Sequence, residues 1–190
     1  MTYYREMSIT RALAAGRGIA IGKWKGLRGL YSGEPEYLVE LAGMAPDGPG
    51  LEIGIRHGHS LLLWAKVREG RGSATGIELV DRPRMRKNIS KSGLDVNVVI
   101  GDSATVPIGL EEVAFLFIDG DHRRTGFKAD LARFVSLVMP GGIVAFHDYG
   151  HPVGRYAEFA VTKYVKRWHE TAGWKRLRRV HYLIAFQRPL

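Results

Sequence analysis

The feature that most constrains the fold is an alternation of short apolar segments with helical patterns, which begins near residue 49. The predicted strands are Gly50–Gly54, Ala74–Leu79, Val96–Ile100, Val113–Ile118 and Ile143–Phe146, followed by two closing strands around His181. The predicted helices are His59–Arg68, Pro83–Ser92, Thr125–Val138 and Gly154–Glu170. Strands that alternate with helices form a parallel sheet covered on both faces, and right-handed crossovers make it doubly wound. The pattern therefore predicts a doubly wound α/β fold.

The rest of the composition fits one soluble domain. A chain of 190 residues can bury one sizeable core. Residues 1–34 do not follow the alternation and are expected to form a basic N-terminal arm or lid, while residues 35–190 form the domain. The chain has no cysteine, which excludes disulfides and thiolate zinc and fits a reducing cytoplasm. No apolar run approaches the roughly 20 residues of a membrane span, so we expect a cytoplasmic protein.

The formal net charge of +9 allows two interpretations. Basic residues are concentrated in residues 1–34 and 163–179. Such a surface could attract nucleic acid, an anionic membrane or a phosphorylated substrate. The alternative, which we favour, is a solvated basic face without a specific partner.

Ligands of doubly wound sheets bind beyond the carboxyl ends of the strands. The first predicted strand leads into Gly54 and Gly58, which permit a sharp turn and a close approach of the backbone to a ligand. The preceding Glu52 could meet a positively charged amino group. Glu78 follows 24 residues after Gly54, where an acid can accept hydrogen bonds from ribose hydroxyls. The third strand leads into Asp102-Ser103, a polar turn suited to an adenine amine.

A second group of polar residues follows the fourth and fifth main strands. The fourth ends in Asp119-Gly120-Asp121-His122 and the fifth in His147-Asp148-Tyr149. If the two strands are neighbours, their ends lie about 5 Å apart. Carboxylate and imidazole ligands there could converge on one magnesium or manganese ion. The alternative is structural: an Asp-Gly turn and a His-Asp pair that caps the next segment.

The succession LEIGIRHGHS, TGIELVD, GDS, FLFIDGDH and MPGGIVAFHDYG resembles the class I S-adenosylmethionine-dependent methyltransferases. It is most similar to their small metal-dependent O-methyltransferase branch, which includes sugar O-methyltransferases, cephalosporin-hydroxylase-like proteins and caffeoyl-CoA O-methyltransferases. The resemblance covers roughly residues 35–190. It implies a Rossmann-like, mostly parallel seven-stranded sheet with an antiparallel C-terminal strand. It also implies S-adenosylmethionine as the cofactor.

The resemblance assigns roles to the polar residues already described. The residues expected to bind the cofactor are Glu52, Gly54, Gly58 and Ser60 at the methionine end, Glu78 at the ribose, Asp102 and Ser103 at the adenine, and Asp119. The metal ligands would be Asp119, His147 and Asp148, with Asp121 as the catalytic base. His147 stands where the sugar O-methyltransferases carry a second acid. Because the pKa of histidine is close to neutral, His147 could instead be the base.

The expected reaction is methyl transfer from S-adenosylmethionine to a hydroxyl, assisted by Mg²⁺ or Mn²⁺. By resemblance, the acceptor is a sugar of a glycoside, an oligosaccharide or a glycosylated natural product. Alternatives are a catechol or phenol, an RNA methylated at ribose and bound by the basic surface, or a domain that binds the cofactor without catalysis. The Asn/Asp-Pro-Pro-aromatic motif of enzymes that methylate base amines does not follow the fourth strand. A homodimer is expected.

Overall fold

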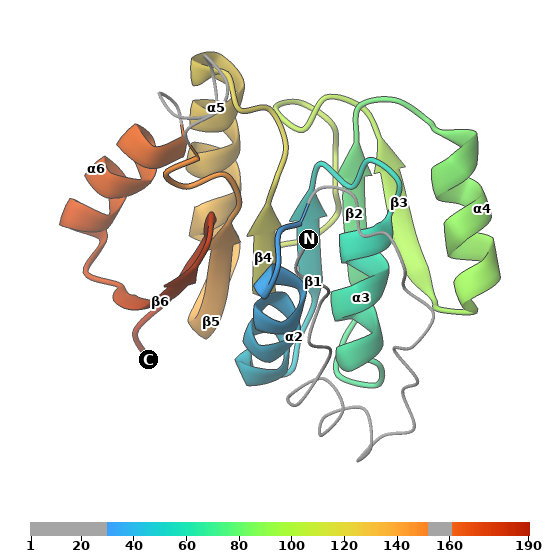
Figure 1. Cartoon of the computed structure of the whole chain (residues 1–190), viewed down its shortest axis with the longest axis horizontal. Helices are drawn as coiled ribbons and strands as arrows, with labels where there is room; N and C mark the ends of the chain where they lie inside the picture. The colour runs from blue at the N-terminus through green and yellow to red at the C-terminus, as the bar shows by residue number, and fades with distance from the viewer. Residues whose placement is uncertain (1–29, 152–160) are drawn as a thin grey trace.

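A seven-stranded sheet forms the centre of the computed structural model, which describes residues 30–151 and 161–190 (Figure 1). The strands are β1 (Gly50–Ile53), β2 (Ala74–Glu78), β3 (Val96–Ile100), β4 (Val113–Ile118), β5 (Val138–Phe146), β6 (Lys175–Val180) and β7 (Leu183–Gln187). Their order in the sheet is β3-β2-β1-β4-β5-β7-β6. Strands β1 to β5 are parallel, and β7 runs antiparallel to both of its neighbours. The predicted doubly wound fold is therefore confirmed.

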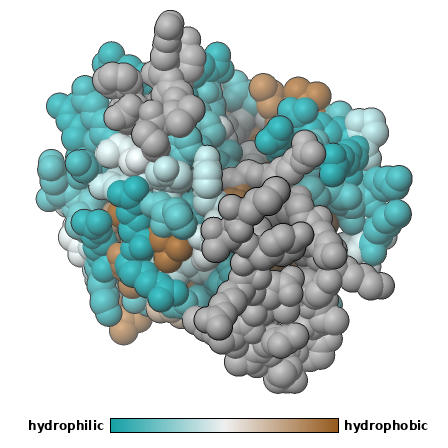
Figure 2. All heavy atoms as spheres, in the orientation of Figure 1, coloured by the Kyte–Doolittle hydropathy of each residue, from teal (hydrophilic) through white to brown (hydrophobic). Residues whose placement is uncertain are grey.

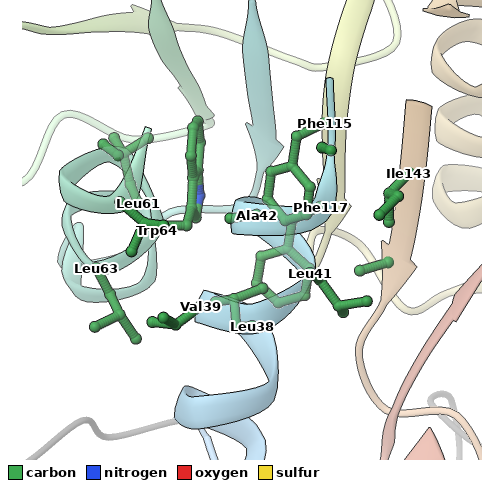
Figure 3. Packing of buried hydrophobic residues seen from close by; sticks show 14 of the residues in the cluster. Leu38, Val39, Leu41, Ala42, Leu61, Leu63, Trp64, Phe115, Phe117 and Ile143 are labelled. Atoms are coloured by element: carbon green, nitrogen blue, oxygen red, sulfur yellow. The ribbon is translucent and has the colours of Figure 1, made fainter. Parts of the chain in front are cut away.

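Helices cover both faces of the sheet. One face carries α2 (Glu34–Met44), α3 (His59–Val67) and α4 (Pro83–Ser92); the other carries α5 (Arg124–Phe134), the short 3₁₀ helix η2 (Val135–Leu137) and α6 (Lys163–Ala172). The central strands are buried on both sides: in β4, Phe115 and Phe117 face the first layer, and Leu116 and Ile118 face the second. Figure 3 shows Trp64 of α3 and the apolar side of α2 packed against these two phenylalanines.

Helix α2 is an element that the sequence analysis did not predict. Pro35 occupies its first turn, where the fixed φ of proline suits a helix start. Its side chains Leu38, Val39, Leu41 and Ala42 are completely buried. The predicted boundary between residues 34 and 35 falls inside this first turn, and Glu34 is itself fully buried. Residues 1–29 of the predicted arm lie outside the described residues.

Two predicted helix limits differ from the structure. The helix predicted at Thr125–Val138 is α5, which ends at Phe134, because η2 turns the chain into β5 already at Val138. The register between β4 and β5 shifts after Val138, so the Pro140-Gly141-Gly142 segment forms an irregularity within β5 and does not precede it. Of the helix predicted at Gly154–Glu170, residues 154–160 lie outside the described residues, and α6 starts at Lys163.

One face of the described part of the molecule is largely polar. In the view of Figure 2, the coloured surface is mostly hydrophilic, with small separate hydrophobic areas. None of the helices within residues 30–151 and 161–190 combines the length and apolarity that crossing a bilayer requires.

Candidate functional site

A cavity of about 850 Å³ opens at the carboxyl ends of the parallel strands. Its walls come from the turns that follow β1, β2, β3, β4 and β5. This is the place where the strand order reverses between β1 and β4, and where doubly wound sheets bind their ligands. Of the residues predicted as a site, eight line it: Gly54, Glu78, Asp102, Ser103, Asp119, Asp121, His147 and Asp148.

Gly54 brings two of these turns together. Its φ of +85° lies in the left-handed region that favours glycine. A Cβ atom at this position would lie 2.3 Å from the carbonyl oxygen of Asp119. The turn after β1 can therefore pack against the turn after β4 only if residue 54 has no side chain.

Glu78, predicted to bind a ribose, lies at the wall of the cavity. Its Oε2 accepts a hydrogen bond from the backbone N–H of Arg56 at 2.6 Å, and its Oε1 accepts one from Nε of Arg82 at 3.3 Å. Arg82 is partly exposed, so this second bond faces the solvent side of the cavity. Glu78 can therefore offer lone pairs to a ligand while Arg56 fixes its position.

The predicted adenine turn is also at the cavity, and its side chains are fixed by local hydrogen bonds. Asp102 Oδ1 accepts from the backbone N–H of Ala104 at 2.9 Å. Ser103 Oγ donates to Oδ1 of Asp130 at 2.6 Å, and Asp130 is buried in α5. Burial raises the pKa of Asp130 to about 6. The backbone and the remaining oxygen of Asp102 are the groups that this turn presents to a ligand.

The structure places Glu52 behind the cavity wall. Its carboxylate is completely buried and accepts hydrogen bonds from Ser60 Oγ at 2.5 Å and Trp64 Nε1 at 2.6 Å. Burial raises the pKa of Glu52 to about 8, against the smaller opposing effect of these two donors. The side chains of Glu52 and Ser60 are therefore bonded within the protein and support the turn after β1, and Gly58 is the left-handed N-cap residue of α3.

Asp119, His122 and Asp148 form a compact cluster at the ends of β4 and β5. One ligand atom from each lies within 4.8 Å of the others. Nε2 of His122 is 2.8 Å from Oδ2 of Asp148 and 3.4 Å from Oδ1 of Asp119. Nδ1 of His147 faces the same two oxygens, at 3.5 Å and 3.2 Å. The structure thus brings the three predicted metal ligands together and adds His122, which the sequence analysis had not assigned a role.

Electrostatics in this cluster are strongly coupled. Burial alone would lower the pKa of His122, but the carboxylates of Asp119 and Asp148 raise it to about 9. His147 behaves in the same way, with Asp119 as the largest raising influence on its pKa. In turn, the two imidazoles hold the pKa of Asp148 well below its usual range, although burial acts in the opposite direction. The imidazoles and the carboxylates thus shift one another's pKa values toward the charged forms.

The donor atoms of the cluster suit a divalent cation. Within the part of the chain that the structure describes, Nε2 of His122 and Nδ1 of His147 are buried nitrogens that have no hydrogen bond of normal geometry. Both face oxygens of Asp119 and Asp148 at ion-pair distances, so either imidazole could complete a site with these two carboxylates. Oxygen and imidazole ligands of this kind fit Mn²⁺ or Mg²⁺.

The carboxylate of Asp121 pairs with Arg123 and is not part of this cluster. Its carboxylate accepts hydrogen bonds from the backbone N–H of Arg123 at 2.9 Å and from Nη2 of the same residue at 2.8 Å. These bonds lower the pKa of Asp121. The side chain lines the cavity, but an acid with a lowered pKa accepts a proton poorly.

Sequence reasoning missed Glu34 as well as His122. Oε2 of Glu34 lies 3.0 Å from Nε2 of His147, although the two residues are 113 positions apart. His122 follows Asp121 directly in the DGDH motif, so it could have been assigned from its position. Glu34 lies in a helix that was not predicted, and no local pattern connects it to β5.

Comparisons with known proteins agree with this architecture. A protein-family model described as a methyltransferase domain matches residues 51–149, just over half of the chain. No curated protein matches the chain in sequence.

Solved structures with this fold include several O-methyltransferases. An O-methyltransferase from Bacillus cereus, in complex with S-adenosylhomocysteine, has a TM-score of 0.63 and 18% identity, covering 95% of this chain and 89% of that chain. TomG from Streptomyces achromogenes, an O-methyltransferase of tomaymycin synthesis bound to S-adenosylmethionine, has a TM-score of 0.60 and 18% identity, covering 98% and 92%. CalS11, a TDP-rhamnose 3′-O-methyltransferase of calicheamicin biosynthesis, has a TM-score of 0.55 and 15% identity, covering 81% and 76%.

The matched family model spans the turns that form the cavity, from β1 to the residues after β5. The solved structures, all below 20% identity, establish the fold. The chain therefore belongs to this methyltransferase family, and it has the fold of the class I S-adenosylmethionine-dependent O-methyltransferases that its sequence resembles.

Proposed function

We propose that the protein transfers the methyl group of S-adenosylmethionine to a hydroxyl group of a sugar, with the assistance of a divalent cation. The observation that carries this proposal is the convergence of Asp119, His122, His147 and Asp148 on one wall of the cavity that also contains Glu78. One cavity thus combines a candidate nucleotide-binding acid with a candidate cation site. That combination matches the needs of O-methylation, because an alcohol is a poor nucleophile until its hydroxyl loses a proton.

We assign different roles in this reaction to different residues of the cavity. A divalent cation held by Asp119, Asp148 and an imidazole would supply a Lewis acid that lowers the pKa of the acceptor hydroxyl. Glu78 would accept hydrogen bonds from the ribose and so fix the methyl donor in place. The acceptor oxygen then forms a bond to the methyl carbon while the bond from that carbon to sulfur breaks. Alignment of these atoms supplies much of the acceleration.

We assign the proton acceptor to His122. Both histidines line the cavity, but the side chain of His122 is 32% exposed, whereas that of His147 is only 3% exposed. His147 is therefore better placed as a ligand. His122 would take the proton once a bound cation neutralises Asp119 and Asp148, whose charges otherwise raise the pKa of His122. Asp121, the base expected from the resemblance, already pairs with Arg123.

The choice of a sugar acceptor is supported by two observations. CalS11, which shares the fold, is a sugar O-methyltransferase. At the cavity, Tyr31 offers a partly exposed aromatic ring, and its hydroxyl lies 2.6 Å from Nε2 of His151. Aromatic rings with a fixed polar end suit the mixed apolar and polar faces of a sugar. A catechol or phenol is the second candidate, since the same ring could stack on a flat acceptor.

The decisive experiment measures methyl transfer from labelled S-adenosylmethionine to panels of sugar and catechol acceptors. We expect activity with Mg²⁺ or Mn²⁺, loss of activity with a chelator, and recovery on adding the metal. Asp119→Asn should reduce turnover by at least about 100-fold, because it removes a charged ligand, and leave cofactor affinity within a few-fold. Asp47→Asn is the matched control, since Asp47 pairs with Arg71 on the surface. Full turnover in the presence of the chelator would disprove the metal-assisted mechanism.

A further inference from the structure

Glu34 is a buried carboxylate that contacts the candidate cation site through one residue. It has no exposed surface, and its Oε2 lies 3.0 Å from Nε2 of His147. We propose that Glu34 is a positioning residue that holds the proton of His147 on Nε2 and so turns Nδ1 towards Asp119 and Asp148. This inference rests on the proposed function, because it assigns a role toward the cation of that site.

The two nitrogens of His147 contact carboxylates on opposite sides of the ring. Nε2 faces Glu34, and Nδ1 lies 3.2 Å from Asp119 and 3.5 Å from Asp148. An ionised carboxylate only accepts hydrogen bonds, so Nε2 must carry the hydrogen. In the neutral ring, Nδ1 then has the lone pair that a cation requires. Histidine ligands of metals commonly donate their second N–H to a carboxylate in this way, which fixes the tautomer and raises the basicity of the ligand.

Glu34 is itself held by two backbone N–H groups from separate segments. Its Oε2 accepts a hydrogen bond from the backbone N–H of Tyr31 at 2.7 Å, and its Oε1 accepts one from the backbone N–H of Tyr182 at 2.8 Å. A buried carboxylate without such donors would be costly. These bonds join the start of α2 to the β6–β7 turn, so the carboxylate cannot swing away from His147.

Aromatic neighbours fix the plane of the His147 ring. The ring of Tyr31 stacks on it with centroids 6.5 Å apart, and Phe117 of β4 meets it edge-on at 6.4 Å. With its plane set by these rings and its Nε2 set by Glu34, the direction of Nδ1 is determined. The site is therefore oriented before a cation binds.

The test is the affinity of the whole protein for Mn²⁺, measured from the electron paramagnetic resonance of the free ion. Glu34→Gln should bind Mn²⁺ about 10–100-fold more weakly than wild type. Glu40→Gln, the same change in the same helix at a residue paired with Arg178, should bind like wild type. His147→Asn should also weaken binding, and adding Glu34→Gln to it should cause no further loss, because the two residues act through one contact. Thermal melts verify that each variant is folded.

Each other outcome contradicts the inference in a distinguishable way. If wild type binds Mn²⁺ and Glu34→Gln binds it within about twofold, the role of Glu34 is wrong and the cation site stands. If the losses of Mn²⁺ affinity caused by the two substitutions multiply in the double variant, Glu34 acts through the fold and not through His147. If wild type shows no Mn²⁺ binding, both the cation site and the inference fail. Should Glu34→Gln not fold, Glu34→Asp keeps the charge but shortens the side chain, and equal affinity in that variant would overturn the inference.

Discussion

At the level of single residues, three buried glutamates differ in what satisfies their carboxylates. Glu52 is bonded by the side chains of Ser60 and Trp64. Glu34 is bonded by two backbone N–H groups and an imidazole. Glu78 is bonded by one backbone N–H group and an arginine at the cavity. Of the three, Glu78 alone lines the cavity, so it is the one that can exchange a partner for a ligand without rearrangement of the core.

Glu78→Gln is expected to weaken cofactor binding. The substitution replaces a charged acceptor by a neutral one, and hydrogen bonds to charged groups contribute about 1.5–3 kcal/mol. We therefore expect the dissociation constant for S-adenosylhomocysteine, measured by titration calorimetry, to rise roughly 10–100-fold. Glu69→Gln, at an exposed residue paired with Lys66, is the control. An unchanged constant in the Glu78 variant would show that another group binds the ribose.

Glu52 should make stability fall with rising pH. Because burial raises the pKa of Glu52 from 4.5 to about 8, the folded state binds its proton more tightly than the unfolded state does. Between these two values the folded protein holds more protons, so the free energy of unfolding decreases as pH rises. Glu52→Gln mimics the protonated acid and removes this dependence. The free energy of unfolding of this variant should match that of wild type near pH 5 and exceed it near pH 8 by on the order of a few kcal/mol. Urea unfolding of the cofactor-free protein at both pH values measures the difference. If the free energy of unfolding changes equally with pH in wild type and in Glu52→Gln, the prediction is wrong.

At the level of elements, the turn after β1 depends on the missing side chain of Gly54. Gly54→Ala should destabilise the protein far more than Gly70→Ala. Both glycines have φ near +80°, so both variants incur left-handed strain of about 1–2 kcal/mol. A Cβ at residue 70 would meet nothing within 4 Å, whereas at residue 54 it would strike the backbone of Asp119. Overpacking adds roughly 1–3 kcal/mol more for Gly54 and separates the turns of the cavity.

Urea unfolding and cofactor titration of the two variants test this difference. Gly70→Ala should keep cofactor affinity, and Gly54→Ala should lose most of it. Equal destabilisation by the two substitutions would mean that the β1 turn can move away from β4 at little cost.

The elements that sequence reasoning predicted well have a clear periodic pattern. Val113–Ile118 is continuously apolar because helices cover both of its faces, and its limits were predicted correctly. The predicted end of α5 was wrong because Val135 and Val138 extend the apolar spacing of the helix, although Val138 already pairs with Val113 in the sheet. Apolar spacing cannot separate a helix from a following strand that shares the same core. Tertiary pairing decides that limit.

The sequence analysis could predict those contacts of the candidate site that follow from the order of the strands. Asp119 and Asp148 follow β4 and β5, so parallel neighbours bring them together. The pairing of Asp121 with Arg123 and that of Glu52 with Trp64 depend on side-chain packing, which the motif does not encode. The contact of Glu34 with His147 joins segments that are distant in the chain, and only the folded structure shows it.

At the level of the whole molecule, some of the basic residues protect an edge of the sheet. Strand β6 is at the edge of the sheet, and it carries Lys175, Arg176, Arg178 and Arg179. Charged side chains on an edge strand prevent another chain from extending the sheet. Arg178 also forms an ion pair with Glu40 of α2. These contacts favour the solvated basic face over a dedicated nucleic-acid surface.

Binding of RNA should accordingly be weak and sensitive to salt. With a net charge of +9, the protein should associate with an RNA oligomer at low ionic strength and lose that affinity at about 200 mM salt. Labelled methyl groups should not enter the RNA at any salt concentration. Filter binding across a salt series, together with scintillation counting, measures both. Retention at high salt with methyl incorporation would support the alternative of an RNA methyltransferase.

The position of β7 has a consequence for biosynthesis. This strand, Leu183–Gln187, inserts between β5 and β6, and the turn that precedes it supplies the Tyr182 N–H group that holds Glu34. During translation, the sheet therefore stays open beside β5 until residue 187 has left the ribosome. A nascent chain can bury the β1–β4 half earlier, but Glu34, which contacts His147, gains its hydrogen bond from Tyr182 only when the β6–β7 hairpin closes. The contact between Glu34 and His147 would then be completed together with the closure of the sheet at β7.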